Sequence, residues 1–252
     1  NATVVLEGPI SFEGTKNNNI TLCGSEILNE TVWIDITNVE TIYIENTRIY
    51  PSIYEGCVNI ARNNLWILES DIVYLYLEVE ADSIEVVDTN VVVINSLISY
   101  KLGIWKHGHG IKTNTNITII NNTIENLVID LAHPWYAEGV YRNNRTVIIK
   151  HNEITDVSID GGGEWLRIIF TDNICGSVFI LLNYAWGVET LIMNTEIRDR
   201  LHVYTTSGNI TIKNNKFIGS VEKPAILSLE IWLSLIHISE PTRPRLISYA
   251  VF

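Results

Sequence analysis

The chain has 252 residues, of which 18% are charged and 46% are apolar, so it can bury a core and is not a disordered chain. Its formal net charge of −12 argues against binding to nucleic acid, because no basic stripe is available to neutralise phosphates. No apolar run approaches the roughly eighteen residues that a membrane-spanning helix needs.

The ends and the cysteines add little about function. The sequence begins with Asn1 and shows no signal peptide, so we expect a processed chain or a fragment. Three cysteines, Cys23, Cys57 and Cys175, lie far apart and in no metal-like spacing. At most one disulfide could form among them, and we interpret all three as small buried residues.

A nine-residue pattern recurs along the chain, with NITIINNTI at residues 116–124 as its template. In every copy the fourth position is Leu, Ile or Val, the seventh is Ser, Thr, Asn or Asp, and the ninth is Ile, Val or Phe. The second position is apolar except at Arg167 and Thr190. In chain order, the nine copies occupy residues 19–27, 41–49, 64–72, 83–91, 116–124, 146–154, 166–174, 189–197 and 209–217.

Each copy predicts a strand, a corner and a second strand. Alternation over positions two to four indicates a strand with one buried face. A small polar residue at position seven indicates a turn, because such side chains bond nearby backbone and Asn tolerates left-handed dihedral angles. The apolar ninth position returns the chain to the core.

A unit that recurs near every 22 residues cannot bury its own inner face, so successive copies must stack as a solenoid with parallel strands. Stacking would also align the corner asparagines, whose amides can bond in ladders. A leucine-rich repeat would need a helical return that the sequence lacks. A calcium-binding nonapeptide solenoid would need more than the single run Asp160-Gly161-Gly162-Gly163, which we expect to be a loop.

The segments GIKTNTNITIINNTIEN (110–126) and GVYRNNRTVIIKHNEI (139–154) resemble the right-handed parallel β-helix repeat of the pectate-lyase-like family of secreted carbohydrate-active proteins. The resemblance covers about residues 19 to 217 and implies an all-β, single-stranded right-handed parallel β-helix of nine or ten rungs. It also implies an extracellular or cell-surface location, and it says little about function.

The last twenty residues, LSLIHISEPTRPRLISYAVF (233–252), resemble a sequencing adapter translated as codons. We therefore expect a β-helix fragment over residues 1–232 and a non-native tail over 233–252, as in an assembled metagenomic read.

Two consecutive rungs are long by about 11 and 8 residues, with insertions within 92–115 and 125–145. Lengthened rungs are where solenoids tend to carry function, and consecutive insertions should project side by side. The predicted carbohydrate-binding residues are Trp105, His107, His109, His133, Trp135, Tyr136, Glu138 and Tyr141.

Three interpretations of these insertions stay open. Aromatic rings can stack on sugar faces while neighbouring polar groups bond hydroxyls. His107 and His109, with His133, could instead bind a metal, although we expect no metal and no cofactor. The insertions could also be loops that cover the coil without any ligand.

Catalysis has weaker support. Gly108-His109-Gly110 matches one motif of polygalacturonase-like hydrolases, but their N-T-D, D-D and R-I-K motifs are absent. Hydrolysis needs two carboxyl groups, and Asp130 and Glu138 are the nearest candidates, although no spacing pairs them. A lyase would need a carboxylate cluster for calcium and a base, and a copper site would need more sulfur than the single Met193. Catalytic residues are therefore unassigned.

We expect a non-catalytic protein that contacts a polysaccharide or glycan surface through the insertions. The alternatives are a polysaccharide hydrolase or lyase, and a structural stalk or spacer.

Overall fold

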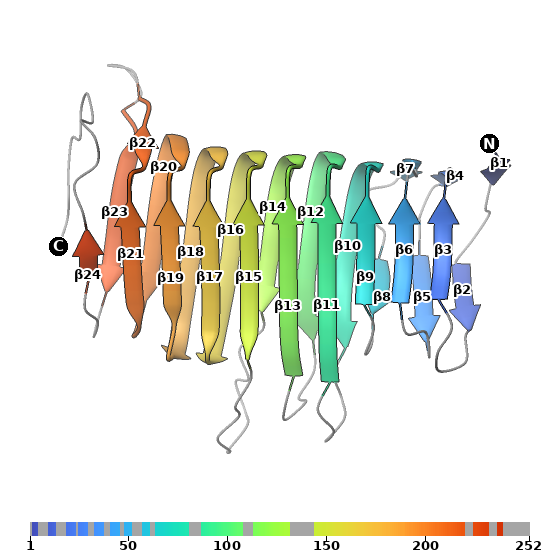
Figure 1. The fold of residues 1–252 in the computed structure, drawn as a ribbon, viewed down its shortest axis with the longest axis horizontal. Coiled ribbons are helices and arrows are strands. Elements are labelled where there is room, and N and C mark those ends of the chain that lie inside the picture. Colours follow the sequence, from blue (N-terminus) through green and yellow to red (C-terminus); the bar gives the residue numbers. More distant parts are fainter. Residues whose placement is uncertain are drawn as a thin grey trace.

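A computed structural model of the chain describes residues 2–4, 10–13, 19–23, 25–29, 33–37, 41–45, 48–51, 57–60, 64–80, 87–107, 113–131, 144–219, 224–231 and 236–238. All regular structure in these ranges is β-strand, and the strands form two sheets that lie face to face (Figure 1). The same ranges contain no helix that is long and apolar enough to span a membrane.

One sheet, called the front sheet after its place in Figure 1, contains ten parallel strands among the described residues. Each strand pairs with the one before and after it in a single register, so the same columns recur from rung to rung. The strands are β3 (Asn19–Cys23), β6 (Thr41–Glu45), β9 (Asn64–Leu68), β11 (Val87–Ile94), β13 (Thr113–Ile120), β15 (Arg145–Lys150), β17 (Leu166–Thr171), β19 (Glu189–Met193), β21 (Asn209–Lys213) and β24 (Ile236–Ile238).

The back sheet contains fourteen described strands, and its strands run opposite in direction to those in front (Figure 1). Its pairings are also parallel, with local bulges in β10, β12, β16 and β18. The strands are β1 (Ala2–Val4), β2 (Ile10–Glu13), β4 (Ser25–Asn29), β5 (Trp33–Thr37), β7 (Arg48–Pro51), β8 (Cys57–Ile60), β10 (Asp71–Glu80), β12 (Leu97–His107), β14 (Thr123–Leu131), β16 (Glu153–Glu164), β18 (Ile174–Trp186), β20 (Glu196–Thr205), β22 (Lys216–Phe217) and β23 (Ile226–Ile231).

Together the sheets confirm the predicted all-β parallel solenoid, in which each front strand is followed by a back strand of the same rung. The stretches described without interruption amount to about five turns. The total of nine or ten rungs and the right-handed sense therefore stay predictions.

The chain passes from the front sheet to the back sheet at the upper edge of Figure 1 through repeated two-residue corners. The first corner residue has a positive φ, as at Asn121 (φ 56) and Asp172 (φ 57), and the second turns its polar side chain inward. The left-handed residue is thus position six of the template, whereas the sequence pattern placed this conformation at position seven. Position seven supplies the side chain that bonds the backbone, as predicted.

These inward side chains form the predicted asparagine ladder. Asn122 Nδ2 donates to Asn152 Oδ1 at 3.0 Å, and Asn152 Nδ2 donates to Asn173 Oδ1 at 3.1 Å. The same amides also donate to carbonyl oxygens, at 2.9 Å for Asn152 Nδ2 to Ile119 O. All three side chains are buried, so the ladder satisfies backbone groups that would otherwise be left without water at the corner.

The core lies between the sheets and consists of aliphatic columns, with positions two and four of the template pointing inward. In β13, for example, Ile117 and Ile119 are fully buried, whereas Thr118 between them faces outward and is half-buried. Cys175 is also buried and free, in agreement with its interpretation as a small core residue. The side chains of Cys23 and Cys57 lie outside the described residues.

The registers correct the frame of two copies. Asn90 pairs with Asn116 and Asn64, so the fourth described rung starts at Asn90 and not at Ser83. Arg167 pairs with Thr146 and Glu189, which moves the copy at 166–174 by one residue. In both copies, the apolar alternation of the sequence fits the template in the uncorrected frame as well as in the corrected one. Only the pairing with neighbouring rungs distinguishes the two frames.

Two further expectations concern residues that were not assigned to strands. The glycine run after Asp160 is not a loop, because it belongs to β16, with a bulge between Gly161 and Gly163. Of the tail 233–252, only Ile236–Ile238 is described, as β24 parallel to β21. The origin of the tail stays a prediction.

Candidate functional site

The chain passes from the back sheet to the front sheet at the lower edge of Figure 1, and of the eight predicted site residues the structure describes two. The backbones of Trp105 and His107 lie in β12, and Trp105 is in register with Glu78 and Asp130. The remaining six lie outside the described residues: His109, His133, Trp135, Tyr136, Glu138 and Tyr141. Their grouping therefore stays a prediction.

The two insertions start from neighbouring rungs, as expected. The chain leaves β12 at its end and enters β13, and it leaves β14 and enters β15, with β12 paired to β14 and β13 to β15. Their lengths differ from the prediction, because equivalent residues are 26 apart between Asn90 and Asn116 and 30 apart between Asn122 and Asn152. With a typical rung of about 22 residues, only the second insertion is markedly long.

A groove of about 610 Å³ lies at this lower edge, where the second insertion rejoins the coil. We call it the corner groove. It crosses four rungs, because equivalent positions of successive rungs line it. The lining residues are Asn144, Arg145, Thr146, Trp165, Leu166, Arg167, Gly187, Val188, Glu189, Gly208 and Asn209.

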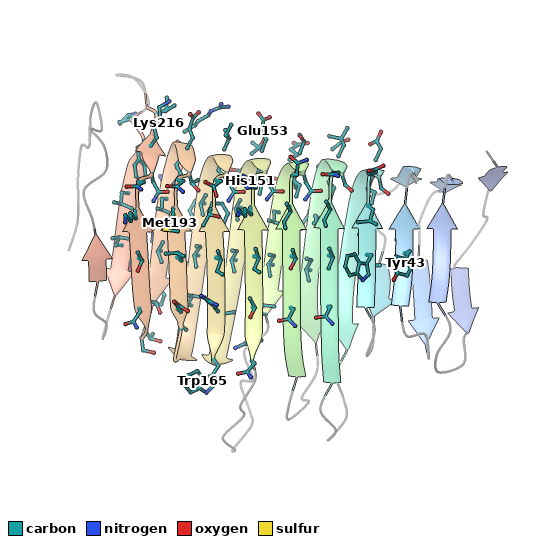
Figure 2. All side chains as sticks on the ribbon, viewed as in Figure 1. Tyr43, His151, Glu153, Trp165, Met193 and Lys216 are labelled. Atoms are coloured by element: carbon teal, nitrogen blue, oxygen red, sulfur yellow. The ribbon has the colours of Figure 1, made fainter. Side chains whose placement is uncertain are left out.

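Trp165 provides an open aromatic surface in the corner groove. It connects β16 to β17 with a φ of 54° and is 56% exposed, and Figure 2 shows it at the lower edge. A Cβ added to Gly187 would lie 3.3 to 3.6 Å from three adjoining atoms of the indole, so one ring face covers that glycine. The glycine leaves room for the ring to lie against the backbone, and more than half of the tryptophan stays exposed to solvent.

A polar pair stands beside this ring. Arg167 and Glu189 are register partners on β17 and β19, and Arg167 Nε lies 2.9 Å from Glu189 Oε2. Both side chains are more than half exposed, so the pair adds little to stability. It does present hydrogen-bond donors and acceptors next to an apolar ring face, with the exposed Asn144 and Asn209 on the same groove.

Arg145 forms the inner wall of the corner groove. In β15 its side chain points inward, in the same alternation as Val147 and Ile149, and only 3% of the residue is exposed. Its Nη1 donates to Leu131 O at 3.3 Å, and its Nη2 donates to Gly162 O. Burial lowers the pKa of Arg145 to about 10, so the guanidinium is still charged at neutral pH.

The back sheet brings a different pair together. Asp130 and Asp160 are register partners on β14 and β16, with outward side chains on neighbouring strands about 4.8 Å apart. The sequence named Asp130 and Glu138 as the nearest candidates, with no spacing that pairs them. Glu138 lies outside the described residues, so that part stays a prediction, and the register adds Asp160 as a carboxylate beside Asp130. Among the described residues, no group of three or more His, Cys, Asp or Glu side chains could hold a metal ion.

Sequence reasoning missed Trp165, Arg145 and Gly187. The alternation of β15 was a usable signal, because it places Arg145 at an inward position where an aliphatic residue is expected. Trp165 gave no such signal, since its position was hidden by the one-residue error in the neighbouring copy. The ring of Trp165 lies against Gly187 on the next rung, and this contact can be seen only in the folded coil.

Comparison with family models, with curated proteins and with solved structures finds no match for this chain. What the structure establishes is therefore the parallel β-solenoid itself.

Proposed function

We propose that this protein is a non-catalytic member of the pectate-lyase-like β-helices that contacts carbohydrate at the cell surface or outside the cell. The contact would involve the corner groove together with the two insertions that emerge beside it. The observation that carries the proposal is the exposed side chain of Trp165 next to the Arg167–Glu189 pair.

The chemistry of this arrangement suits a sugar ring. The apolar face of a pyranose can stack on an indole, while its hydroxyl groups both donate and accept hydrogen bonds. Arg167 can donate to such hydroxyls, and Glu189 can accept from them. An exposed indole also argues against a plain stalk, in which tryptophans would be buried against the coil.

Replacement of Trp165 by alanine tests the proposal. We expect Trp165→Ala to weaken retention of glycans on an array about tenfold, which corresponds to about 1.4 kcal/mol, without a change in melting temperature. Trp105→Ala and Trp135→Ala should weaken it as well. Tyr100→Ala is the control, because Tyr100 is 41% exposed on β12 away from the groove. Unchanged retention in all three tryptophan variants contradicts the proposal.

A polysaccharide hydrolase is the second candidate, and the pairing of Asp130 with Asp160 favours it. A retaining glycosidase needs two carboxyl groups about 5 to 5.5 Å apart, and aspartates on neighbouring strands are a pair of this kind. Release of reducing ends from a polysaccharide panel by the wild-type chain, abolished by Asp130→Asn and by Asp160→Asn, would establish this function. Absence of release rules it out for the substrates in the panel.

A further inference from the structure

Four acceptor motifs for N-linked glycans, Asn-x-Ser/Thr, begin at asparagines whose side chains the structure describes. They begin at Asn116, Asn121, Asn144 and Asn209, and all four asparagines are exposed. In such a motif the sugar is attached to the side-chain amide nitrogen of the asparagine. The folded chain is therefore best suited to carry a glycan where this nitrogen is both exposed and free of other bonds.

Hydrogen bonding separates the four motifs into two pairs. At Asn116 and Asn121, Nδ2 already donates to an asparagine of the preceding rung, at 2.8 and 2.7 Å. In the part of the chain that the structure describes, the side-chain amides of Asn144 and Asn209 make no hydrogen bond. Both of these free amides line the corner groove, so a sugar can be attached there without loss of an existing bond.

An aromatic neighbour distinguishes Asn144 from Asn209. Arg145 N donates to Trp165 O at 3.0 Å, in the register of β15 with β17. Asn144 and Trp165 therefore hold equivalent positions on neighbouring rungs, about 4.8 Å apart. Trp165 is 56% exposed, so a sugar on Asn144 has an indole within reach. The register partner of Asn209 is Glu189, which offers a carboxylate and no ring.

The alternation of β15 turns the motif at Asn144 outward. Arg145, its middle residue, points inward and is buried, whereas Asn144 is exposed and Thr146 is half-buried on the outer side. Residues two apart in an extended segment lie on the same side, so the amide and the hydroxyl of the motif face outward together. The corner groove of about 610 Å³ lies beside them and is large enough for a sugar ring.

We infer that Asn144 carries an N-linked glycan whose first sugar lies against the exposed part of Trp165 in the corner groove. The donor is an oligosaccharide linked to a polyprenyl diphosphate. A bond forms between Asn144 Nδ2 and the anomeric carbon of the sugar, while the bond from that carbon to the diphosphate oxygen breaks. The polyprenyl diphosphate leaves with the electron pair, and Nδ2 loses one proton. The apolar face of the attached sugar then packs on the indole.

This inference rests on the proposed location at the cell surface or outside the cell, because N-linked glycans mark secreted proteins. It differs from the proposed function in the source of the sugar, which here is bonded to the chain itself. The two ideas fail separately. Chain from a bacterial host that attaches no N-linked glycans serves for the glycan array, whereas the attachment is measured on chain secreted from a eukaryotic cell line.

Peptide mapping by mass spectrometry tests the attachment. An amidase that removes N-linked glycans converts each asparagine that carried one into aspartate, so the conversion measures occupancy at each motif. We expect Asn144 to be occupied in most secreted molecules, and in a larger fraction of them than Asn116 or Asn121. Occupancy at Asn144 that is absent, or no higher than at these two, overturns the inference.

Melting temperatures test the contact with Trp165. After an endoglycosidase has trimmed each glycan to its first sugar, Asn144→Gln should melt about 3 °C below the wild type, because the packed sugar is lost. Asn209→Gln is the matched control and should melt with the wild type. In a Trp165→Ala background, Asn144→Gln should make no difference. An equal loss in that background, or no loss in the wild-type background, overturns the placement of the sugar.

Discussion

At the scale of single residues, the neighbours Ile119 and Thr118 face opposite sides of β13. Ile119 is fully buried between the sheets, and Thr118 is half-buried on the outer face. We expect Ile119→Asp to lower the free energy of unfolding by several kcal/mol, because a lone charge would be buried. Thr118→Lys should change it by less than about 0.5 kcal/mol. Chemical denaturation of both variants measures the difference, and comparable losses would contradict the facing of this strand.

Cys175 shows what burial does to a reactive group. Burial raises the pKa of its thiol far above the usual range, and the opposing attraction of Arg198 is the smaller influence. The thiol is therefore neutral and inside the core at physiological pH. It acts as a small apolar side chain, in keeping with the interpretation made from the spacing of the cysteines.

At the scale of structural elements, the buried asparagine ladder at the corners should contribute more to stability than the exposed Asn116–Asn90 bond between strands of the front sheet. Asn152 accepts from Asn122 N at 2.8 Å and donates to buried carbonyl oxygens, whereas Asn116 makes one exposed bond to Asn90 Oδ1 at 2.8 Å. An inner amide cannot be replaced by water, but an outer amide can.

Asn152→Ala should therefore lower the free energy of unfolding by about 3 kcal/mol, since it leaves several buried backbone groups unsatisfied. Asn116→Ala, the matched control, should lower it by less than about 1 kcal/mol. Denaturant titration of both variants gives the comparison. Similar losses would show that the buried ladder contributes no more than its exposed counterpart.

At the scale of the whole molecule, the outer face of the front sheet carries an apolar stripe on an acidic protein. The stripe consists of half-buried outward residues at equivalent positions of the rungs and is interrupted by Thr118; its apolar members are Tyr43, Trp66, Val92, Ile148, Ile169 and Leu191. Its aromatic end is ordered by stacking of Tyr43 on Trp66, with ring centroids 6.3 Å apart, and Figure 2 shows Tyr43 on that face. At neutral pH, the net charge of −12 keeps copies of the chain apart.

This repulsion disappears near the sequence isoelectric point of about 4.9. We expect light scattering from the purified chain to peak near pH 5, where apolar stripes can meet without charge repulsion. The double variant Ile148→Lys, Leu191→Glu keeps the net charge at neutral pH and interrupts the stripe, so its scattering peak should be much smaller. A peak of equal height in the variant would place the association elsewhere on the surface.

The sequence by itself determined the class of fold, the facing of the strands and, in the copies whose frame the register confirms, the positions of the corners. Each of these features follows from the alternation of apolar residues and the placing of polar residues within a single nine-residue copy, as in the template at 116–124. Two copies were misaligned for the same reason, since alternation near Ser83 and Leu166 fitted the template without being in register with its neighbours.

The tertiary structure decided the corner groove. Trp165 lies against the backbone only because Gly187 is one rung away, and Arg145 reaches the carbonyl oxygens of Leu131 and Gly162 only across the coil. Such contacts join residues 14 or more positions apart, at distances that the closure of each rung sets. A linear pattern records which side a residue faces, whereas its neighbours on the adjacent rungs exist only after the chain has coiled.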